Sequence, residues 1–330
     1  MKLLIITQKV DSNDDNLGFF HRWIEEFAHQ CESVIVICLF EGAHNLPNNV
    51  RVLSLGKENG VSRLGYLKPF YLYIWKERKN YDAVFVHMNQ IYVILGWKLW
   101  WLLGKKISLW YAHGTTSFSL RIATFFTHTI FSSTKEGFRL KTKKLCLVGQ
   151  GIDTSLFIQK TDHSIGEEFK IVTVGRITPA KQIEKMIDMA ESLHKENIPA
   201  VLSLFGSGDT AYTQYLAGYA QSKNISEHII FVGGMSYVEV AKKLYEYDVF
   251  LNLGKTGSLD KAILDAASAQ LPVVTTNADF IQHTTDALAE IKHVYQMSPD
   301  ERAERATEAR AWVSKHHELK GFIGRIISML

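Results

Sequence analysis

Cysteine is scarce in this chain. Its 330 residues include three cysteines, Cys31, Cys38 and Cys146, and none of them belongs to a C-x-x-C pair. Disulfide frameworks and structural zinc sites use more cysteines, in paired spacings. The sequence therefore argues against both, and it favours a reducing compartment, which predicts a cytoplasmic protein.

Long hydrophobic runs are also lacking. The longest apolar stretch, residues 91–103, is interrupted by Lys98 and is shorter than the roughly 20 residues that span a bilayer. The apolar run at residues 2–7 is soon followed by three aspartates within residues 11–15, so it predicts a buried strand and not a signal peptide. We expect a soluble protein or one that sits on a membrane surface.

The chain has almost no excess of either charge. It contains 37 lysines and arginines and 34 aspartates and glutamates, which gives a formal net charge of +3. Nucleic-acid-binding domains are strongly basic, so we expect no nucleic-acid partner. Hydrophobic residues make up 46% and charged residues 22%, which is typical of folded globular chains. At about 150 residues per domain, the length predicts two domains.

Two series of short apolar runs alternate with stretches of helical periodicity. The first comprises residues 2–7, 33–40, 83–88, 107–113, 128–133 and 145–151, and the second comprises residues 169–175, 199–206, 228–234, 247–254 and 271–277. Strand and helix in alternation imply right-handed crossovers and parallel sheets. We predict an α/β fold of two doubly wound domains, with an active site in a cleft between the carboxyl ends of their strands.

The boundary is expected in the polar stretch 153–169, which shows no strong period and is interpreted as a linker. The predicted domains are residues 1–157 and 158–330. The sequence after residue 297 is helical in character, and its last helix is a candidate to pack back on the first domain.

Three segments of the second half have the features of a phosphate site. In the first, an apolar run ends at Gly175 and Arg176, and Lys181 opens a helix. A strand-end glycine permits close approach of a ligand, and the two cations suit phosphate oxygens. Ordinary surface charge at a strand–helix turn is an equally open interpretation.

The second segment places Gly206 and Gly208 directly after an apolar run, where backbone amides can face a phosphate or a base. A plain tight turn is the alternative. Ala211 stands where the G-x-G-x-x-G fingerprint has its third glycine, and no acidic ribose partner follows, which argues against a nicotinamide dinucleotide site.

The third segment, residues 249–277, has a loop that leads into a helix from about Asp260. Helix N-terminal amides attract anions. Asp260 is either a simple N-cap or a ligand contact, and Lys261 is either a phosphate contact or solvated. Asp265, further along the helix, is placed to accept hydrogen bonds from ribose hydroxyls.

These segments together carry a resemblance to a known family. The motifs VTVGRITPAKQIEKMI, LFGSGD and LDAASAQLPVVTTN, with LVGQGIDTSLF before them, resemble glycosyltransferase family 4 in order and spacing. The resemblance implies a GT-B fold, with two Rossmann-like domains facing across a cleft. It also implies a retaining, metal-independent hexosyltransferase that uses a UDP- or GDP-linked sugar and no other cofactor.

The resemblance assigns roles to matching positions. Arg176 and Lys181 would neutralise the diphosphate of the donor as it leaves, while Ser258 and Leu259 would present backbone amides to it. The glycines of the second segment would contact the donor too. The second domain would thus bind the nucleotide sugar.

Two departures from the family pattern concern the donor. Asp265 stands where the family has a ribose-binding glutamate, and its side chain is one methylene shorter. Gly257 replaces a second glutamate that engages the donor sugar, with Asp260 and Lys261 as possible substitutes. These departures are the support for an alternative function, a nucleotide-sugar-binding protein with weak or no turnover.

The first domain would bind the acceptor, a saccharide or a lipid-linked one, as in polysaccharide biosynthesis. Gly18 lies in a loop that, by resemblance, closes over donor and acceptor, or it belongs to an ordinary strand–helix loop. His113 ends an apolar run where the family has a histidine near the donor sugar, whereas a structural role is favoured for His87. No protein nucleophile is evident, so retention would require the leaving diphosphate to help deprotonate the acceptor.

Aromatic and basic residues are interleaved in residues 63–81 and 94–111. Such a mixture suits the headgroup region of an anionic membrane. We hypothesise peripheral attachment to the inner face of the membrane, and the alternative is that these aromatics pack against the sheet.

Overall fold

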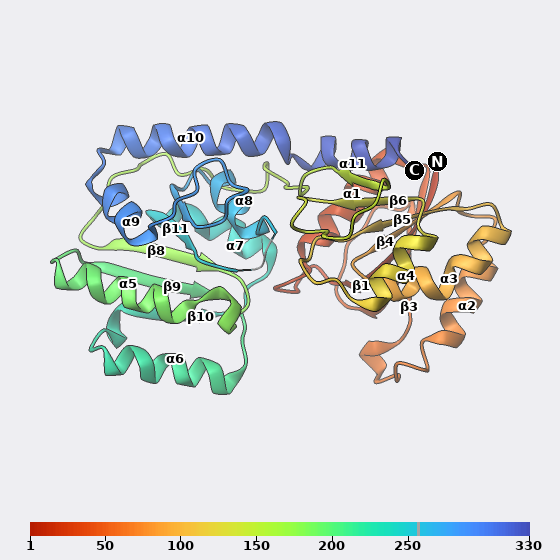
Figure 1. Cartoon of the computed structure of the whole chain (residues 1–330), viewed down its shortest axis with the longest axis horizontal. Coiled ribbons are helices and arrows are strands. Elements are labelled where there is room, and N and C mark those ends of the chain that lie inside the picture. Colours follow the sequence, from red (N-terminus) through yellow and green to blue (C-terminus); the bar gives the residue numbers. More distant parts are fainter. Residues whose placement is uncertain (256–257) are drawn as a thin grey trace. The chain divides into compact units, whose positions relative to one another are not determined.

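The structure is a computed structural model that describes residues 1–255 and 258–330. It comprises two compact units, unit 1 with residues Met1–Gly151 and Leu319–Leu330, and unit 2 with residues Ile152–Glu318. Each unit is a parallel sheet with helices on both faces (Figure 1). The prediction of two doubly wound α/β domains is therefore confirmed.

Unit 1 has a seven-stranded sheet in the order β3-β2-β1-β4-β5-β6-β7. Its strands are β1 (Lys2–Val10), β2 (Ser33–Glu41), β3 (Val50–Ser54), β4 (Ala83–His87), β5 (Lys106–Trp110), β6 (Thr129–Ser132) and β7 (Leu145–Leu147). Every neighbouring pair is parallel. The central strand β1 is almost continuously buried because helices cover both sides of it.

Alternate residues of β1 supply two separate cores. The helices of unit 1 are α1 (Phe19–Gln30), α2 (Leu67–Lys76), α3 (Gln90–Leu102), α4 (Phe118–Phe126) and α11 (Leu319–Ser328), with the 3₁₀ turn η1 (Lys57–Asn59). Leu3 and Ile5 pack with α1 and α11, whereas Leu4 and Ile6 pack with α2, α3 and α4. The C-terminal helix α11 thus belongs to unit 1, where Phe322 lies 4.5 Å from Trp23 between ring centroids.

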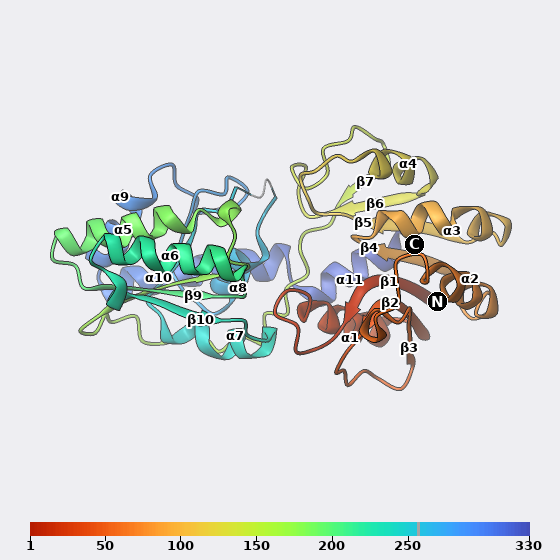
Figure 2. The same ribbon diagram turned by 90° about the horizontal axis from the view of Figure 1, so that it is seen from below.

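Unit 2 has a five-stranded parallel sheet in the order β10-β9-β8-β11-β12. Its neighbouring strands β9 and β10 are labelled in Figure 2. Its strands are β8 (Phe169–Val174), β9 (Ala200–Phe205), β10 (Ile229–Gly233), β11 (Val249–Asn252) and β12 (Val273–Thr275). Its helices are α5 (Ile183–Lys195), α6 (Thr210–Ser222), α7 (Tyr237–Lys243), α8 (Lys261–Ser268), α9 (Ala287–Gln296) and α10 (Pro299–His316), with the 3₁₀ turns η2 (Pro179–Lys181), η3 (Ser226–His228) and η4 (Leu244–Glu246).

Adjacent residues of β8 again face opposite cores. Ile171 packs with α5, α6 and α9, and Val172 packs with α7, α8 and α10. Because helices cover both faces of the sheet, a ligand can reach it at the carboxyl ends of β8, β9, β10 and β11, where loops emerge. Ligands of open parallel sheets bind at such an edge.

The segment interpreted as a linker packs on unit 2 instead. Phe157 is buried in the core beside α7 and α8, and the ammonium of Lys160 lies 3.2 Å from a carboxylate oxygen of Asp248. Its polar composition concealed these two anchors. The chain passes between the units at Gly151 and Ile152, and again at Glu318 and Leu319.

Candidate functional site

Glycines occupy the carboxyl ends of three neighbouring strands in unit 2. Gly175, Gly206 and Gly233 follow or end β8, β9 and β10, with φ angles of 137°, 143° and 89°. A Cβ on Gly206 would lie 2.1 Å from the carbonyl oxygen of Gly175. Only glycine fits there, so this edge of the sheet presents bare backbone to an approaching ligand.

The side chain of Lys181 extends over the ends of β8 and β11. A Cβ on Gly175 would lie 2.9 Å from the Lys181 ammonium, and one on Gly254 would lie 3.5 Å from its Cδ. Lys181 is the last residue of the turn η2, and α5 begins two residues later at Ile183. These two elements therefore set the position of the Lys181 backbone. The Lys181 ammonium forms an ion pair with Asp260 at the start of α8.

Asp260 is the N-cap of α8. Its carboxylate accepts hydrogen bonds from the backbone N–H of Ala262 at 3.3 Å and from the Asn252 amide at 3.1 Å. Burial alone would raise the pKa of Asp260, but the Lys181 ammonium and these hydrogen bonds outweigh burial and lower it. Asp260 thus acts as the N-cap of α8, and its ion pair holds the Lys181 ammonium at the N-terminus of that helix.

Arg176 is exposed beside this group and forms no ion pair with any residue that the structure describes. The loop that carries it is tied to the next one, since the backbone N–H of Ile177 donates to the Ser207 carbonyl at 2.8 Å. Gly208 completes this contact, because a Cβ there would lie 2.6 Å from the Ile177 Cβ. The free guanidinium therefore stands on a fixed loop.

Lys261 and Asp265 form a buried cluster with Tyr237. The Lys261 ammonium lies 2.7 Å and 3.1 Å from the two carboxylate oxygens of Asp265, which also accepts a 3.0 Å hydrogen bond from the Tyr237 hydroxyl. The same ammonium lies 3.8 Å from the centroid of the Tyr237 ring. Burial lowers the pKa of Lys261 and raises that of Asp265, against their mutual attraction. The Lys261 ammonium is therefore largely removed from water, and its assignment as a phosphate contact stays a prediction.

The two residues Ser258 and Leu259, which precede Asp260, are buried. Ser258 is 8% exposed and Leu259 is 2% exposed, and the Asn277 side chain donates to the Ser258 carbonyl at 2.9 Å. Gly257, the position that departs most from the expected glutamate, lies outside the described residues.

In unit 1, Gly18 is the N-cap of α1. Its N–H donates to the Asp14 carbonyl at 3.0 Å, and a Cβ on Gly18 would lie 2.4 Å from that oxygen. His113 follows β5 and is exposed, with its Nδ1 accepting from the Thr115 N–H at 3.2 Å. Both residues therefore lie in loops at the carboxyl ends of unit 1 strands.

His87 is a core residue. It is 2% exposed, stacks on Phe20 with ring centroids 4.0 Å apart, and lies 3.3 Å from the Thr7 hydroxyl through Nδ1. Burial lowers its pKa to about 3, so the ring stays neutral near neutral pH. These contacts agree with the structural role favoured from the sequence.

The structure therefore brings Gly175, Arg176, Lys181, Gly206, Gly208 and Asp260 to one edge of the unit 2 sheet. Sequence reasoning missed three polar residues of this region, Asn252, Tyr237 and Asn277. Asn252 had a signal, because it is a polar residue that ends the apolar run of β11. The other two carry none, since each meets its partner through tertiary packing alone.

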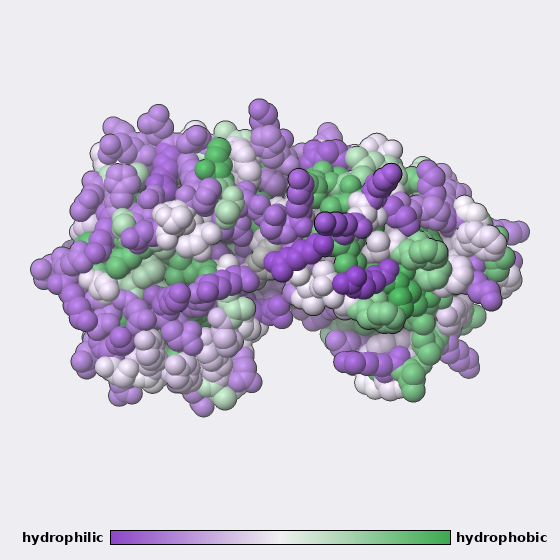
Figure 3. All heavy atoms as spheres, viewed as in Figure 1, coloured by the Kyte–Doolittle hydropathy of each residue, from purple (hydrophilic) through white to green (hydrophobic). Residues whose placement is uncertain are grey.

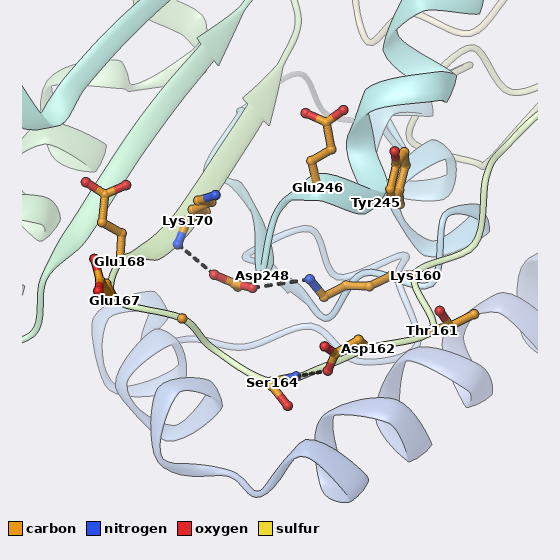
Figure 4. Close-up of a pocket in the computed structure, with 11 residues that line it drawn as sticks. Lys160, Thr161, Asp162, Ser164, Glu167, Glu168, Lys170, Tyr245, Glu246 and Asp248 are labelled. Carbon is orange, nitrogen blue, oxygen red and sulfur yellow. Dashed lines mark hydrogen bonds and ion pairs between the residues drawn. The ribbon is translucent and has the colours of Figure 1, made fainter.

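A pocket of about 620 Å³ lies elsewhere in unit 2, beside Lys160, Lys170 and Asp248 (Figure 4). It is at the amino ends of β8 and β11, the opposite edge from Lys181. The Asp248 carboxylate is satisfied there by Lys160 and by the backbone N–H of Lys170 at 2.8 Å, as the close-up shows. This pocket gives no reason to move the candidate site.

Two further properties hold for residues 1–255 and 258–330. No cluster of three or more histidine, cysteine, aspartate or glutamate side chains is arranged to hold a metal ion. No helix in this part of the chain combines the length and the apolar character needed to cross a bilayer.

Comparison with known families bears on this edge of unit 2. Residues 157–309 match the family described as Glycosyl transferases group 1. The matched segment contains every candidate residue of unit 2, from Gly175 to Asp265. No curated protein matches the sequence significantly.

Solved structures agree over the whole chain. HepE from Anabaena, in a complex with UDP and glucose, has a TM-score of 0.79 at 15% identity and covers 99% of this chain and 98% of its own. Sucrose-phosphate synthase from Thermosynechococcus elongatus has a TM-score of 0.79 at 13% identity, over 100% and 98% of the two chains. WaaG, described as a glycosyltransferase involved in lipopolysaccharide biosynthesis, has a TM-score of 0.69 at 13% identity, over 99% of each chain. The predicted fold class, two Rossmann-like domains of the GT-B type, is confirmed.

Proposed function

We propose that this protein transfers a sugar from a nucleoside-diphosphate sugar to an acceptor, and that unit 2 binds the donor. The observation that carries the proposal is the position of Lys181. Its ammonium lies at the N-terminus of α8 and over the glycine-bearing ends of β8 and β11, within the segment that matches glycosyl transferases group 1. A cation, helix amides and bare backbone at one edge suit a diphosphate.

The same residues suit the chemistry of transfer. The bond from the anomeric carbon to the diphosphate oxygen breaks, and negative charge grows on that oxygen. An ammonium has three N–H donors, so Lys181 can keep Asp260 and still donate to a phosphate oxygen. Arg176, exposed on its loop, adds a planar fork that matches phosphate geometry. Preorganised cations at a leaving group are an effective source of rate enhancement.

For the nucleoside, Asp265 is the candidate ribose partner. Its oxygens already accept from Lys261 and Tyr237, but a carboxylate has about four acceptor positions, so a ribose hydroxyl can still be accommodated. UDP is the first donor class to test, because HepE was crystallised with UDP and glucose, and GDP is the second.

For the rest of the reaction we propose retention of configuration and no metal requirement. The leaving diphosphate would take the acceptor proton as the new glycosidic bond forms. His113 and Gly18, in loops of unit 1, are the candidates that contact the sugar and the acceptor. The acceptor would be a saccharide or a lipid-linked saccharide, as in polysaccharide assembly on the cytoplasmic side of the membrane.

The test is a panel of UDP- and GDP-linked sugars, with release of free nucleoside diphosphate as the readout, in buffers with EDTA. We expect release with one donor class and its loss in Arg176→Ala. Lys185→Ala is the matched control, because Lys185 is an exposed cation nearby on α5. Absence of nucleotide binding by wild type would overturn the proposal.

A second candidate is a nucleotide-sugar-binding protein without turnover. The observation in its favour is the buried Lys261–Asp265 pair, which occupies the expected ribose carboxylate. Tight nucleotide binding with no release from any donor, across saccharide and lipid-linked acceptors, would favour this candidate.

A further inference from the structure

The outward sides of three neighbouring helices in unit 1 are apolar and basic, and we name them the α2–α4 face. Side-chain contacts tie the three helices to one another. The Tyr71 hydroxyl on α2 donates to the Leu95 carbonyl on α3 at 2.9 Å, and Trp97 on α3 stacks on Phe126 of α4 at 4.0 Å. Figure 3 shows hydrophobic residues gathered over these helices.

On α2 the exposed residues form one helical stripe. Lys68, Tyr71, Leu72, Trp75 and Lys76 are all exposed and recur at intervals of three and four residues along one side of the helix. Leu72 is 56% and Trp75 is 52% exposed. The stripe therefore has apolar residues at its centre and a lysine at each end.

On α3 and α4 the same composition recurs. Trp101 and Leu102 at the end of α3 are each 66% exposed, and Phe118 and Phe125 on α4 are 78% and 77% exposed. Surface helices of water-soluble domains normally present a polar outer side, whereas Lys98 is the only polar residue among the exposed residues of α3. Of the residues that the structure describes, every exposed tryptophan and phenylalanine belongs to α2, α3 or α4.

Charge on this face has one sign. None of the three helices contains an aspartate or glutamate, and they carry Lys68, Lys76, Lys98 and Arg121, all exposed. The first acidic residue after α2, Glu77, is 3% exposed and pairs with Arg51 at 3.1 Å, so it does not neutralise the face. The face is complementary to an anionic surface.

We propose that the α2–α4 face is a docking surface for an anionic lipid bilayer. Tryptophan and phenylalanine insert at the headgroup boundary, while lysine and arginine chains reach the lipid phosphates. The sequence hypothesis of membrane attachment thereby becomes a defined surface. Each of the two interpretations of these aromatics from the sequence applies to some of them. Trp100 packs in the core, whereas Trp101 is exposed. The proposal does not depend on the activity of unit 2.

Vesicle flotation of the full chain tests the proposal. We expect binding to phosphatidylcholine vesicles that contain phosphatidylglycerol, weak binding to phosphatidylcholine alone, and release as salt is raised. The triple variant Lys68→Gln, Lys98→Gln and Arg121→Gln should lose about 100-fold in partition, at roughly fivefold per charge.

Apolar variants test the insertion separately. Trp75→Ser, Trp101→Ser and Phe125→Ser should each weaken partition by roughly tenfold. Tyr215→Ser and Ile281→Ser are matched controls, because these side chains of unit 2 are 54% and 44% exposed and lie off the face. Circular dichroism and nucleotide binding confirm that each variant is folded.

Three results would overturn the proposal. They are absence of wild-type binding to anionic vesicles at low salt, equal binding to neutral vesicles, and unchanged binding in both the charge and the apolar variants. Dimerisation that masks the face without vesicle binding would also overturn it, in favour of a second copy as the occupant.

Discussion

Lys261 and Asp265 lie one turn apart on α8 and form an ion pair that is almost removed from water. Their side chains are 15% and 9% exposed, and the shortest N–O distance is 2.7 Å. The attraction between the two charges offsets a considerable cost of removing them from water. Removal of one partner leaves the other charge buried without compensation, and the effect on stability is then large.

A double-mutant cycle should show strong coupling between these residues. Lys261→Met strands a buried carboxylate and Asp265→Leu strands a buried ammonium, so we expect each to destabilise the fold by about 3–5 kcal/mol. The double variant should lose clearly less than the sum, because neither charge remains. Urea unfolding of the four proteins measures this.

The control cycle uses Lys195 and Glu191 on α5, which have the same four-residue spacing and a 2.6 Å contact, but with the lysine 69% exposed. Its coupling should be far smaller, since water solvates an exposed ion already. Additive losses at Lys261 and Asp265 would contradict the assignment of a coupled buried pair.

Lys181 should discriminate between the parts of a nucleotide. If its ammonium serves the diphosphate, Lys181→Met should weaken binding of UDP or GDP by about tenfold or more, as expected for a lost hydrogen bond to a charged group. Binding of the free nucleoside should stay unchanged. Calorimetry with both ligands measures the difference.

Lys185→Met removes a similar charge four residues later and should leave both affinities unaltered. Equal weakening of nucleoside and nucleoside diphosphate by Lys181→Met would instead indicate a structural role through its ion pair with Asp260.

Gly206 should tolerate no side chain. A Cβ there would meet the Gly175 carbonyl oxygen at 2.1 Å, and the backbone has a φ of 143°. Gly206→Ala should therefore destabilise unit 2 by at least about 1–3 kcal/mol. Gly218→Ala, in α6 and with no atom within 4 Å of its Cβ, should stabilise by up to about 1 kcal/mol. Thermal unfolding compares the two, and similar melting temperatures would refute the expected clash.

Most of the fold could be predicted from the sequence, because strands of a parallel sheet that are buried on both faces have continuous apolar sequences. β1 and β8 are examples, and both were expected. β3 (Val50–Ser54) was missed, since it lies at the sheet edge and its sequence, VRVLS, is short and half polar. An edge strand is buried on fewer sides and leaves a weaker pattern.

The candidate site was accessible only in part. Gly175, Arg176 and Lys181 were found because strand ends and the helix start can be located from local sequence. The contact between Lys181 and Asp260 joins residues 79 positions apart, and the burial of Lys261 depends on Tyr237 of another helix. No local periodicity reports such tertiary pairings.

His87 should make the stability of unit 1 depend on pH. Its folded pKa of about 3 is below the ordinary value of 6.5, because burial disfavours the charged ring. Between these pH values the unfolded chain binds a proton at His87 and the folded chain does not. The contribution of neutral His87 to the free energy of unfolding is therefore complete above pH 6.5 and is lost as the pH falls toward 3. The expected loss between pH 7 and pH 4.5 is about 2–3 kcal/mol. His87→Gln should flatten that dependence in urea unfolding even if it lowers stability throughout, whereas His128→Gln, at an exposed histidine, should retain it. A wild-type slope in His87→Gln would show that His87 is protonated in the folded state.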